Sequence, residues 1–445
     1  MYVTGVKFTD LKGFDTLDFD FTRPDGSCAG WTVFVGGNSS GKSTLLKGIS
    51  LALMGPDFGR QLIDYQSGWI RSGKLSAEVS LEVFGDKDMD TLKQKGRYVE
   101  TFSAGVRWKR DTESENATFN LKEKRKPNKT RIKTPENGLW NPNVSGWFCA
   151  GYGPMRRLSG SSSEAMRFMS RTDVVGRFVT LFREDATLSE SEAWLKMNYA
   201  RGLEADVPEK QADYQNLINN VRQLLGDGLL PIGLTISRIM VDKVFVKDKS
   251  GVELPMKEIS DGCRGIYATI LDLIHQMHEV YGGNGLFKNI DNHIVVNRPG
   301  VVLIDEIEAH LHPQWQREIP AWLKSHFPKV QFLVTTHSPL VAQAADDNGI
   351  FVLPSPDDKQ QPRPLSNDEA TRIRMGRAEK TLLGTAFGLK ATRTDWALKK
   401  IKDWELLDAK KKAGVRLSAT ERNTYENDLS YLKSAYDDEV PYETN

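Results

Sequence analysis

Apolar and polar residues alternate over several stretches in the first third of the chain. Residues 75–83 place an apolar side chain at every second position, which is the period of a strand with one buried face, and residues 98–102 also mix apolar and polar side chains. Residues 75–135 therefore predict a β-rich lobe of antiparallel strands. Three other short runs are almost entirely apolar, as expected of strands buried on both faces: residues 31–35, 301–304 and 330–334.

Other stretches have the apolar spacing of helices. Residues 45–53 and 266–274 repeat apolar side chains every three to four positions. Residues 160–230 predict a helical insertion in which no heptad pattern is sustained, so we expect a compact head without a coiled-coil arm. The tail after Pro364 is polar and also helical in pattern.

A glycine-rich motif follows the first apolar run. Residues 36–43 read G-G-N-S-S-G-K-S, which matches G-x-x-x-x-G-K-[ST] between a predicted strand and a predicted helix. In such a loop backbone N–H groups surround a phosphate at a helix N-terminus, the lysine reaches the β- and γ-phosphates, and the serine hydroxyl binds Mg²⁺. The sequence thus predicts an ATP site with these residues: Gly36, Asn38, Ser39, Ser40, Gly41, Lys42, Ser43 and Thr44.

Two later apolar runs end in residues suited to phosphoryl transfer. Asp305 and Glu306 follow the run at 301–304, and His337 follows the run at 330–334. In phosphoryl transfer the first carboxylate helps to hold Mg²⁺, and a second polar group orients the attacking water. We therefore expect Asp305 and Ser43 to bind the metal, and Glu306 and His337 to be catalytic.

These motifs together resemble the RecF/SMC and OLD branch of the ABC-type ATPases. Residues 1–21 are similar to the first two strands of that branch, residues 303–313 to its Walker B motif and D-loop, and residues 335–339 to its switch histidine. The resemblance implies an α/β fold: an ABC-type P-loop ATPase head with a β-rich N-terminal lobe, a helical insertion and a helical C-terminal tail.

The same resemblance implies a signature motif ahead of Walker B. Ser260 and Gly262 precede a predicted helix and are similar to this motif, although the family's usual second Gly and Gln are Asp261 and Cys263 here. In the family these residues touch the γ-phosphate held by another subunit, which implies a homo-oligomer, at least a dimer, joined through its ATP sites. A Q-loop glutamine is not evident.

The motifs divide the chain into four expected domains. They are an N-terminal ATPase lobe at 1–145, a helical insertion with return strands at 146–255, a C-terminal ATPase lobe at 256–363, and a helical tail at 364–445 for oligomer or partner contacts.

Composition favours a cytoplasmic ATPase over a secreted or membrane protein. The 445 residues include only three scattered cysteines, too few for a disulfide framework, and no segment approaches the ~20 apolar residues that span a bilayer. A net charge of +1 argues against a wholly basic nucleic-acid clamp. A basic cluster at Lys122–Lys133 is either a solvated hairpin tip or a contact to nucleic acid without base specificity.

The tail gives no sign of a nuclease. OLD-family nucleases carry a metal-binding carboxylate cluster on strands, and the acidic pairs after His337 stand in loop-like sequence. A head without this domain, with residues 150–157 and 381–389, is similar to the ATPase subunits of Septu-type anti-phage systems. That similarity implies an HNH-type nuclease as a separate partner.

Three functions remain open at this point. The first is an ATPase that regulates an effector nuclease in phage defence. The second is a RecF-like repair ATPase that clamps DNA directly, and the third is an ATP-sensing module with negligible turnover.

Overall fold

A computed structural model describes residues 1–93, 101–111, 117–121, 135–158, 160–230, 233–355, 358 and 360–436, with side chains up to 432. The chain divides into two compact units, Met1–Thr381 and Leu382–Asn445. The predicted basic cluster at Lys122–Lys133 lies outside the described residues. The four predicted domains stay a prediction.

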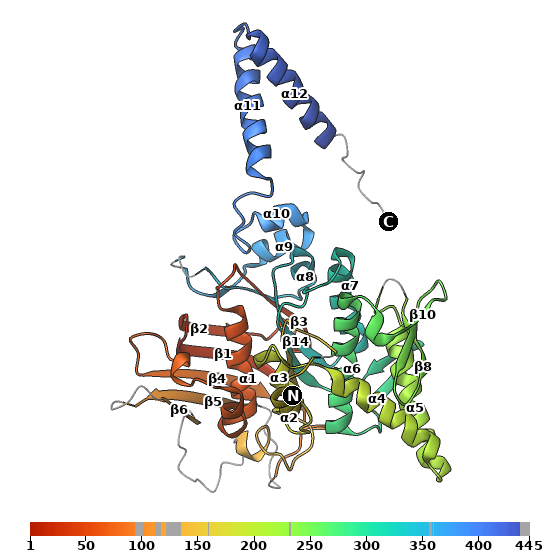
Figure 1. Ribbon diagram of the computed structural model, residues 1–445. Coiled ribbons are helices and arrows are strands. Elements are labelled where there is room, and N and C mark those ends of the chain that lie inside the picture. Colours follow the sequence, from red (N-terminus) through yellow and green to blue (C-terminus); the bar gives the residue numbers. More distant parts are fainter. Residues whose placement is uncertain are drawn as a thin grey trace. The chain divides into compact units, whose positions relative to one another are not determined.

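An antiparallel sheet forms the N-terminal lobe of the first unit (Figure 1). Along β5 the apolar residues Phe102, Ala104, Val106 and Trp108 are buried, and the residues between them are more exposed, which is the predicted alternation. The β-rich lobe is thus confirmed. In spatial order the strands are β2 (Phe14–Asp20), β1 (Tyr2–Leu11), β4 (Ser76–Phe84), β5 (Thr101–Arg110) and β6 (Ala117–Leu121).

A second, mostly parallel sheet carries the motif-bearing strands. Its strands β3, β14 and β13 are buried almost throughout, because they are covered on both faces. In spatial order this sheet contains β16 (Arg363–Pro364), β15 (Ile350–Val352), β3 (Gly30–Val35), β14 (Val330–Thr336), β13 (Gly300–Ile304) and β7 (Cys149–Tyr152).

Helix α1 (Lys42–Gly59) shares one hydrophobic core with both sheets. Leu45 and Ile49 of this helix belong to the same buried cluster as Phe8 of β1, Leu333 of β14 and Leu303 of β13. Most residues of this helix are buried, as expected of a helix that packs on more than one side.

The helical insertion and its return strands complete the first unit. Ser366 caps α9 through a capping box with Glu369. The helices of the insertion are α2 (Ser163–Met169), α3 (Val179–Phe182), α4 (Ser189–Glu204) and α5 (Pro208–Gly226), and the helices that follow it are α6 (Asp261–Tyr281), α7 (Pro313–His326), α8 (Pro339–Gln343), α9 (Asn367–Met375) and α10 (Ala378–Leu382). The strands are β8 (Thr235–Ile239), β9 (Val244–Lys247), β10 (Glu253–Pro255), β11 (Phe287–Ile290) and β12 (His293–Val296).

The second unit is built around two helices, α11 (Asp395–Lys412) and α12 (Ala419–Tyr436). Trp404 of α11 stacks on Tyr425 of α12 with 6.0 Å between ring centroids. Lys400 of α11 pairs with the buried Asp428 of α12 at 2.9 Å. Within the described residues, no helix is long and apolar enough to cross a membrane.

Candidate functional site

Three parallel strands bring the sequence motifs to one edge of the central sheet. Val35 of β3 is paired with Thr336 of β14, and Val334 of β14 is paired with Ile304 of β13. The segment after each strand therefore leaves the sheet at the same edge, which is where α/β proteins bind ligands. These segments are the glycine-rich loop, His337 and the Asp305–Glu306 pair.

The glycine-rich loop turns tightly between β3 and α1. Gly41, which precedes α1, has φ of 92°, and a Cβ there would lie 2.6 Å from the Phe14 ring. At Gly36 a Cβ would lie 2.3 Å from the carbonyl oxygen of Leu353. Both positions thus require glycine, because a side chain would meet neighbouring atoms or leave its preferred backbone region.

Ser40 provides a polar atom suited to a ligand in this loop. Its hydroxyl oxygen is buried and has no hydrogen-bond partner within the part of the chain that the structure describes. A buried hydroxyl without a partner costs free energy unless a ligand or water meets it. The loop and the start of α1 hold the other predicted phosphate-binding residues: Asn38 and Ser39 are exposed, and Ser43 and Thr44 are half-buried.

Lys42 lies with its ammonium group inside the loop. Its Nζ donates to the carbonyl oxygens of Gly36 at 2.9 Å and Gly37 at 2.8 Å. Burial lowers the pKa of Lys42, and the carboxylates of Glu306 and Asp305 oppose that shift. The lysine of the first motif and the carboxylates of the second therefore share one electrostatic environment.

Asp305 is held by the neighbouring strand. It is 2% exposed, and Thr335 Oγ1 donates to its Oδ1 at 2.5 Å. The same threonine oxygen accepts the backbone N–H of Glu306 at 2.8 Å. Glu306 is half-buried and has φ of 44°, a backbone region that costs a non-glycine residue energy. Sequence reasoning gave Thr335 no role, although it stands two residues before His337.

His337 is linked to Glu308, a residue to which sequence reasoning also gave no role. The backbone N–H of His337 and the hydroxyl of Thr336 both donate to the Glu308 carboxylate, the latter at 2.6 Å. Burial lowers the pKa of His337, and the positive charge of Lys42 lowers it further. His337 is thus brought together with the other site residues, and a neutral ring is favoured.

Arg156 fixes the backbone around the two carboxylates. Its guanidinium is buried and donates to the carbonyl oxygens of Asp305 at 2.9 Å, Glu306 at 3.0 Å and Ile307 at 3.2 Å. Burial lowers the pKa of Arg156 to about 10, with the nearby carboxylates opposing the shift. The sequence drew attention to the glycine-rich stretch that contains Arg156, but it could not show which carbonyl oxygens the guanidinium contacts.

A pocket of about 490 Å³ opens beside the glycine-rich loop. Its size lies in the range of small-molecule sites. Arg71, which also lines it, donates to the carbonyl oxygen of Gly13 at 2.5 Å. The loop residues at its wall are Ser39, Ser40 and Gly41, and Thr44 lines it from α1; Gly13 lines it from the turn between β1 and β2, and Phe14 and Asp15 from the start of β2.

The predicted signature residues are not joined to this cluster. Ser260 is exposed and precedes α6, and its side chain makes no capping hydrogen bond. Within the described residues, no hydrogen bond or ion pair connects Ser260 or Gly262 to the glycine-rich loop. Gly262 instead packs on the segment after Glu306, where a Cβ would lie 2.2 Å from the carbonyl oxygen of His310.

A known protein family matches the part of the chain that contains these motifs. Residues 31–342 match the family described as "AAA domain, putative AbiEii toxin, Type IV TA system". The chain belongs to this family. The match to this AAA family runs from β3 to α8 and so includes the glycine-rich loop, the predicted signature residues, Asp305 and His337. The prediction of an ABC-type P-loop ATPase similar to the Septu ATPases is confirmed.

Curated relatives of this AAA-family chain carry names from two systems. The Septu protein PtuA of Bacillus mycoides is 25% identical over 355 residues, 79% of this chain and 40% of that protein. The Retron Vc95 probable ATPase of Vibrio cholerae is 22% identical over 385 residues, 78% of this chain and 72% of that protein. The chain thus spans well under half the length of the Bacillus mycoides protein that it matches.

Solved structures with a similar chain course include an SMC head domain from Thermotoga maritima. Its TM-score is 0.44 and its identity 15%, over 82% of this chain and all of that chain.

Proposed function

We propose that the chain binds ATP with Mg²⁺ at the edge of the central sheet and hydrolyses it. One observation carries this proposal: three adjacent parallel strands end at the same edge of the sheet, and the residues that follow them share one electrostatic environment. These residues are Lys42, Asp305, Glu306 and His337. A lysine for the phosphates, a carboxylate for Mg²⁺ and a second polar group that orients water are the parts that phosphoryl transfer uses. Family membership supports the same conclusion.

The residues present fit both parts of the substrate complex. The glycine cradle and the free hydroxyl of Ser40 suit a polyphosphate, and the pocket beside the loop has room for a nucleoside. Ser43 and Asp305 offer the oxygen ligands that Mg²⁺ prefers. Mg²⁺ held by these residues would supply positive charge against the phosphates.

Each side chain then has a separate task. Lys42 places a positive charge against the phosphates, and its buried position strengthens that attraction. Glu306 orients the attacking water and accepts its proton, with the backbone held by Thr335 and Arg156. His337, held through Glu308, donates a hydrogen bond to the γ-phosphate.

The site would be completed by a second copy of the chain. Ser260 is exposed at the start of α6, and its hydroxyl is free of a capping bond. Because Gly262 packs on the segment that follows Glu306, the signature and that segment form one surface. In a dimer this surface would face the partner's γ-phosphate, so that ATP joins two chains.

The biological role that we propose is control of a separate effector nuclease in phage defence. The relatives named for Septu and retron systems support this role, since both are similar to this chain over most of its length. An HNH-type nuclease is the partner that we infer. ATP-dependent assembly would supply the switch, and the partner would cut nucleic acid.

The decisive experiment compares ATP affinity with turnover in Glu306→Gln. Removal of a general base lowers turnover about 10²- to 10⁴-fold, whereas ATP binding should be retained. Glu318→Gln changes a half-buried carboxylate of α7 that accepts from Gln314 at 3.1 Å; it is the matched control and should behave as wild type. Lys42→Ala should weaken ATP binding itself. A Glu306→Gln protein with wild-type turnover would contradict the assignment.

A further inference from the structure

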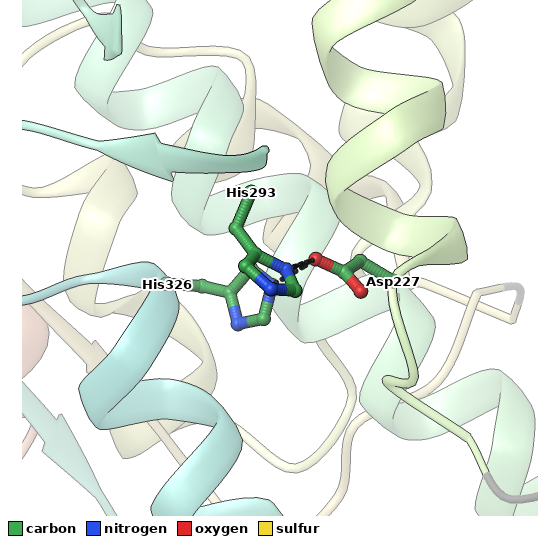
Figure 2. Close-up of side chains that lie close together, drawn as sticks. All are labelled: Asp227, His293 and His326. Atoms are coloured by element: carbon green, nitrogen blue, oxygen red, sulfur yellow. Dashed lines mark hydrogen bonds and ion pairs between the residues drawn. The ribbon is translucent and has the colours of Figure 1, made fainter. Parts of the chain in front are cut away.

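Three side chains distant in sequence meet away from the ATP site. Asp227 follows α5, His293 begins β12, and His326 ends α7. His293 Nδ1 lies 2.5 Å and His326 Nε2 lies 3.2 Å from the same oxygen, Asp227 Oδ2. Figure 2 shows both imidazole rings turned toward the carboxylate. One ligand atom from each of the three residues lies within 4.8 Å of the others.

The hydrogen bonds of His326 favour one position of the ring proton. Its Nδ1 lies 2.9 Å from the carbonyl oxygen of Trp322 and 3.0 Å from Ser325 Oγ, and the Ser325 hydroxyl itself donates to that carbonyl at 2.9 Å, so this arrangement favours Nδ1 as the donor. In the neutral ring Nε2 then has a lone pair, which faces the Asp227 carboxylate oxygen. In that tautomer the Nε2 lone pair and the Asp227 oxygen are both available to one cation.

The surroundings hold this arrangement in place. The Trp322 ring stacks on His326 with 4.1 Å between centroids, and its Nε1 donates to the backbone oxygen of Asp227 at 2.7 Å. His326 is 5% exposed. An N–H from the second ring nitrogen to a backbone carbonyl is the usual support of a metal-binding histidine, because it fixes the tautomer and the ring orientation.

We propose that Asp227, His293 and His326 bind one Zn²⁺ ion through Oδ2, Nδ1 and Nε2. Two imidazoles and a carboxylate are ligands that this ion prefers. Ligand atoms of a tetrahedral zinc lie about 3.3 Å apart for bonds of about 2.0 Å, so the His326 contact already fits and His293 would move outward by roughly 0.8 Å. The His293 side chain is 60% exposed and has space for this movement.

The fourth position of the metal faces solvent. Asp227 and His293 line a surface pocket of about 450 Å³, together with Arg222, Gln223 and Asn292. A water molecule or a small anion could complete the coordination from this side. Three protein ligands with one open position is also the ligand number of catalytic zinc sites, whereas structural sites have four protein ligands.

The ion would join the helical insertion to the ATPase core. Asp227 belongs to the insertion, whereas His326 ends the helix that starts at Pro313, directly after the D-loop. A bond through the metal would therefore fix the far end of α7 to α5 and β12. This linkage is independent of nucleotide, so it can be tested without ATP.

The experiment measures Zn²⁺ binding to the full chain without a polyhistidine tag, after removal of metals with a chelator. Affinity and stoichiometry are obtained by competition with a chromophoric chelator, and thermal unfolding is followed with and without Zn²⁺. We expect one ion per chain and a higher unfolding midpoint when zinc is present. His293→Ala and His326→Gln should each weaken binding at least about tenfold.

His278→Gln is the control, since it removes a histidine of α6 that lies outside the cluster. It should leave zinc affinity unchanged. Wild-type protein that binds no zinc, or a His293→Ala protein that binds as tightly as wild type, would overturn the proposal. The first result would assign the cluster to an aspartate–imidazolium ion pair, and the second would place the ion elsewhere.

Discussion

The hydroxyl of Thr335 donates to the carboxylate of Asp305 across two adjacent parallel strands, at 2.5 Å. Its oxygen also receives the backbone N–H of Glu306 at 2.8 Å. A single buried hydroxyl thus orients the proposed metal ligand and the backbone of the proposed general base. Thr335 is a positioning residue in this site, because it acts through its two neighbours.

Thr335→Val should impair hydrolysis while preserving the fold. Valine has the shape of threonine but leaves Asp305 Oδ1 and the Glu306 N–H without their partner. Loss of a supporting hydrogen bond to a metal ligand costs about 10- to 100-fold in activity or metal affinity. Turnover measured across a Mg²⁺ titration checks this, and Thr335→Ser should recover most of the loss. Equal Mg²⁺ dependence in Thr335→Val and wild type would refute the role.

Mixing two inactive variants should restore activity if the sites are shared. Lys42→Ala removes the loop lysine, and Ser260→Arg blocks the signature surface. A mixed dimer keeps one intact site, so an equal mixture should reach roughly a quarter of wild-type turnover, since half of the dimers are mixed and each has one of two sites. Turnover should also rise more steeply than linearly with protein concentration. Strict proportionality without rescue would indicate a self-contained monomer.

His275 should make the wild type sensitive to acid. Burial lowers the pKa of His275 to about 4, and the nearby His278 adds to that shift. The folded state therefore binds fewer protons than the unfolded state between pH about 6.5 and 4, and stability falls as the pH falls through this window. The full effect is on the order of 3 kcal/mol, at about 1.36 kcal/mol per unit.

The measurement must compare variant with wild type, because a neighbour acts in the opposite direction. Burial raises the pKa of Asp272 to about 6. Its contribution to the free energy of unfolding therefore falls as the pH rises from about 4 to 6. Urea unfolding of wild type and His275→Gln at several pH values isolates the histidine. The free energy of unfolding of the variant should rise relative to that of the wild type as the pH falls from 6.5 to 4. A difference in free energy that stays constant with pH would contradict the lowered pKa of His275.

The isolated chain should not cut DNA or RNA with Mg²⁺ and ATP. Its effect on nucleic acid would require the proposed nuclease, and we expect the tail to contribute to that contact. Deletion from Trp396 onward removes α11 and α12, which lie outside every nucleotide motif. Partner binding and protection against phage should then be lost while ATP binding persists. Cleavage by the lone chain that disappears in Glu306→Gln would overturn this division.

The alternation of apolar and polar residues and the motifs were enough to predict the main strands of the fold. Residues 75–83 alternate in sequence and form β4, and the apolar runs at 31–35 and 301–304 fall on β3 and β13. These signals are local, because a strand with one buried face must alternate and a strand buried on both faces must be apolar. The motif residues could be identified from the sequence too, because they directly follow such strands in the chain.

The partners of those residues could not be selected from the sequence. Thr335, Glu308 and Arg156 gain their roles only when β7, β13 and β14 are paired side by side, since each acts on an atom of another segment. The same holds for Asp227, His293 and His326, which no spacing rule relates.

What the sequence by itself determined was the set of strands, the nucleotide loop and the order of the motifs, because these depend on short-range periodicity and on spacing along the chain. What only the tertiary structure decided was which polar atoms meet. Hydrogen bonds and metal ligation depend on distances of a few ångströms between residues that are tens to hundreds of positions apart. Strand pairing and helix packing set those distances, and the covalent order does not contain them.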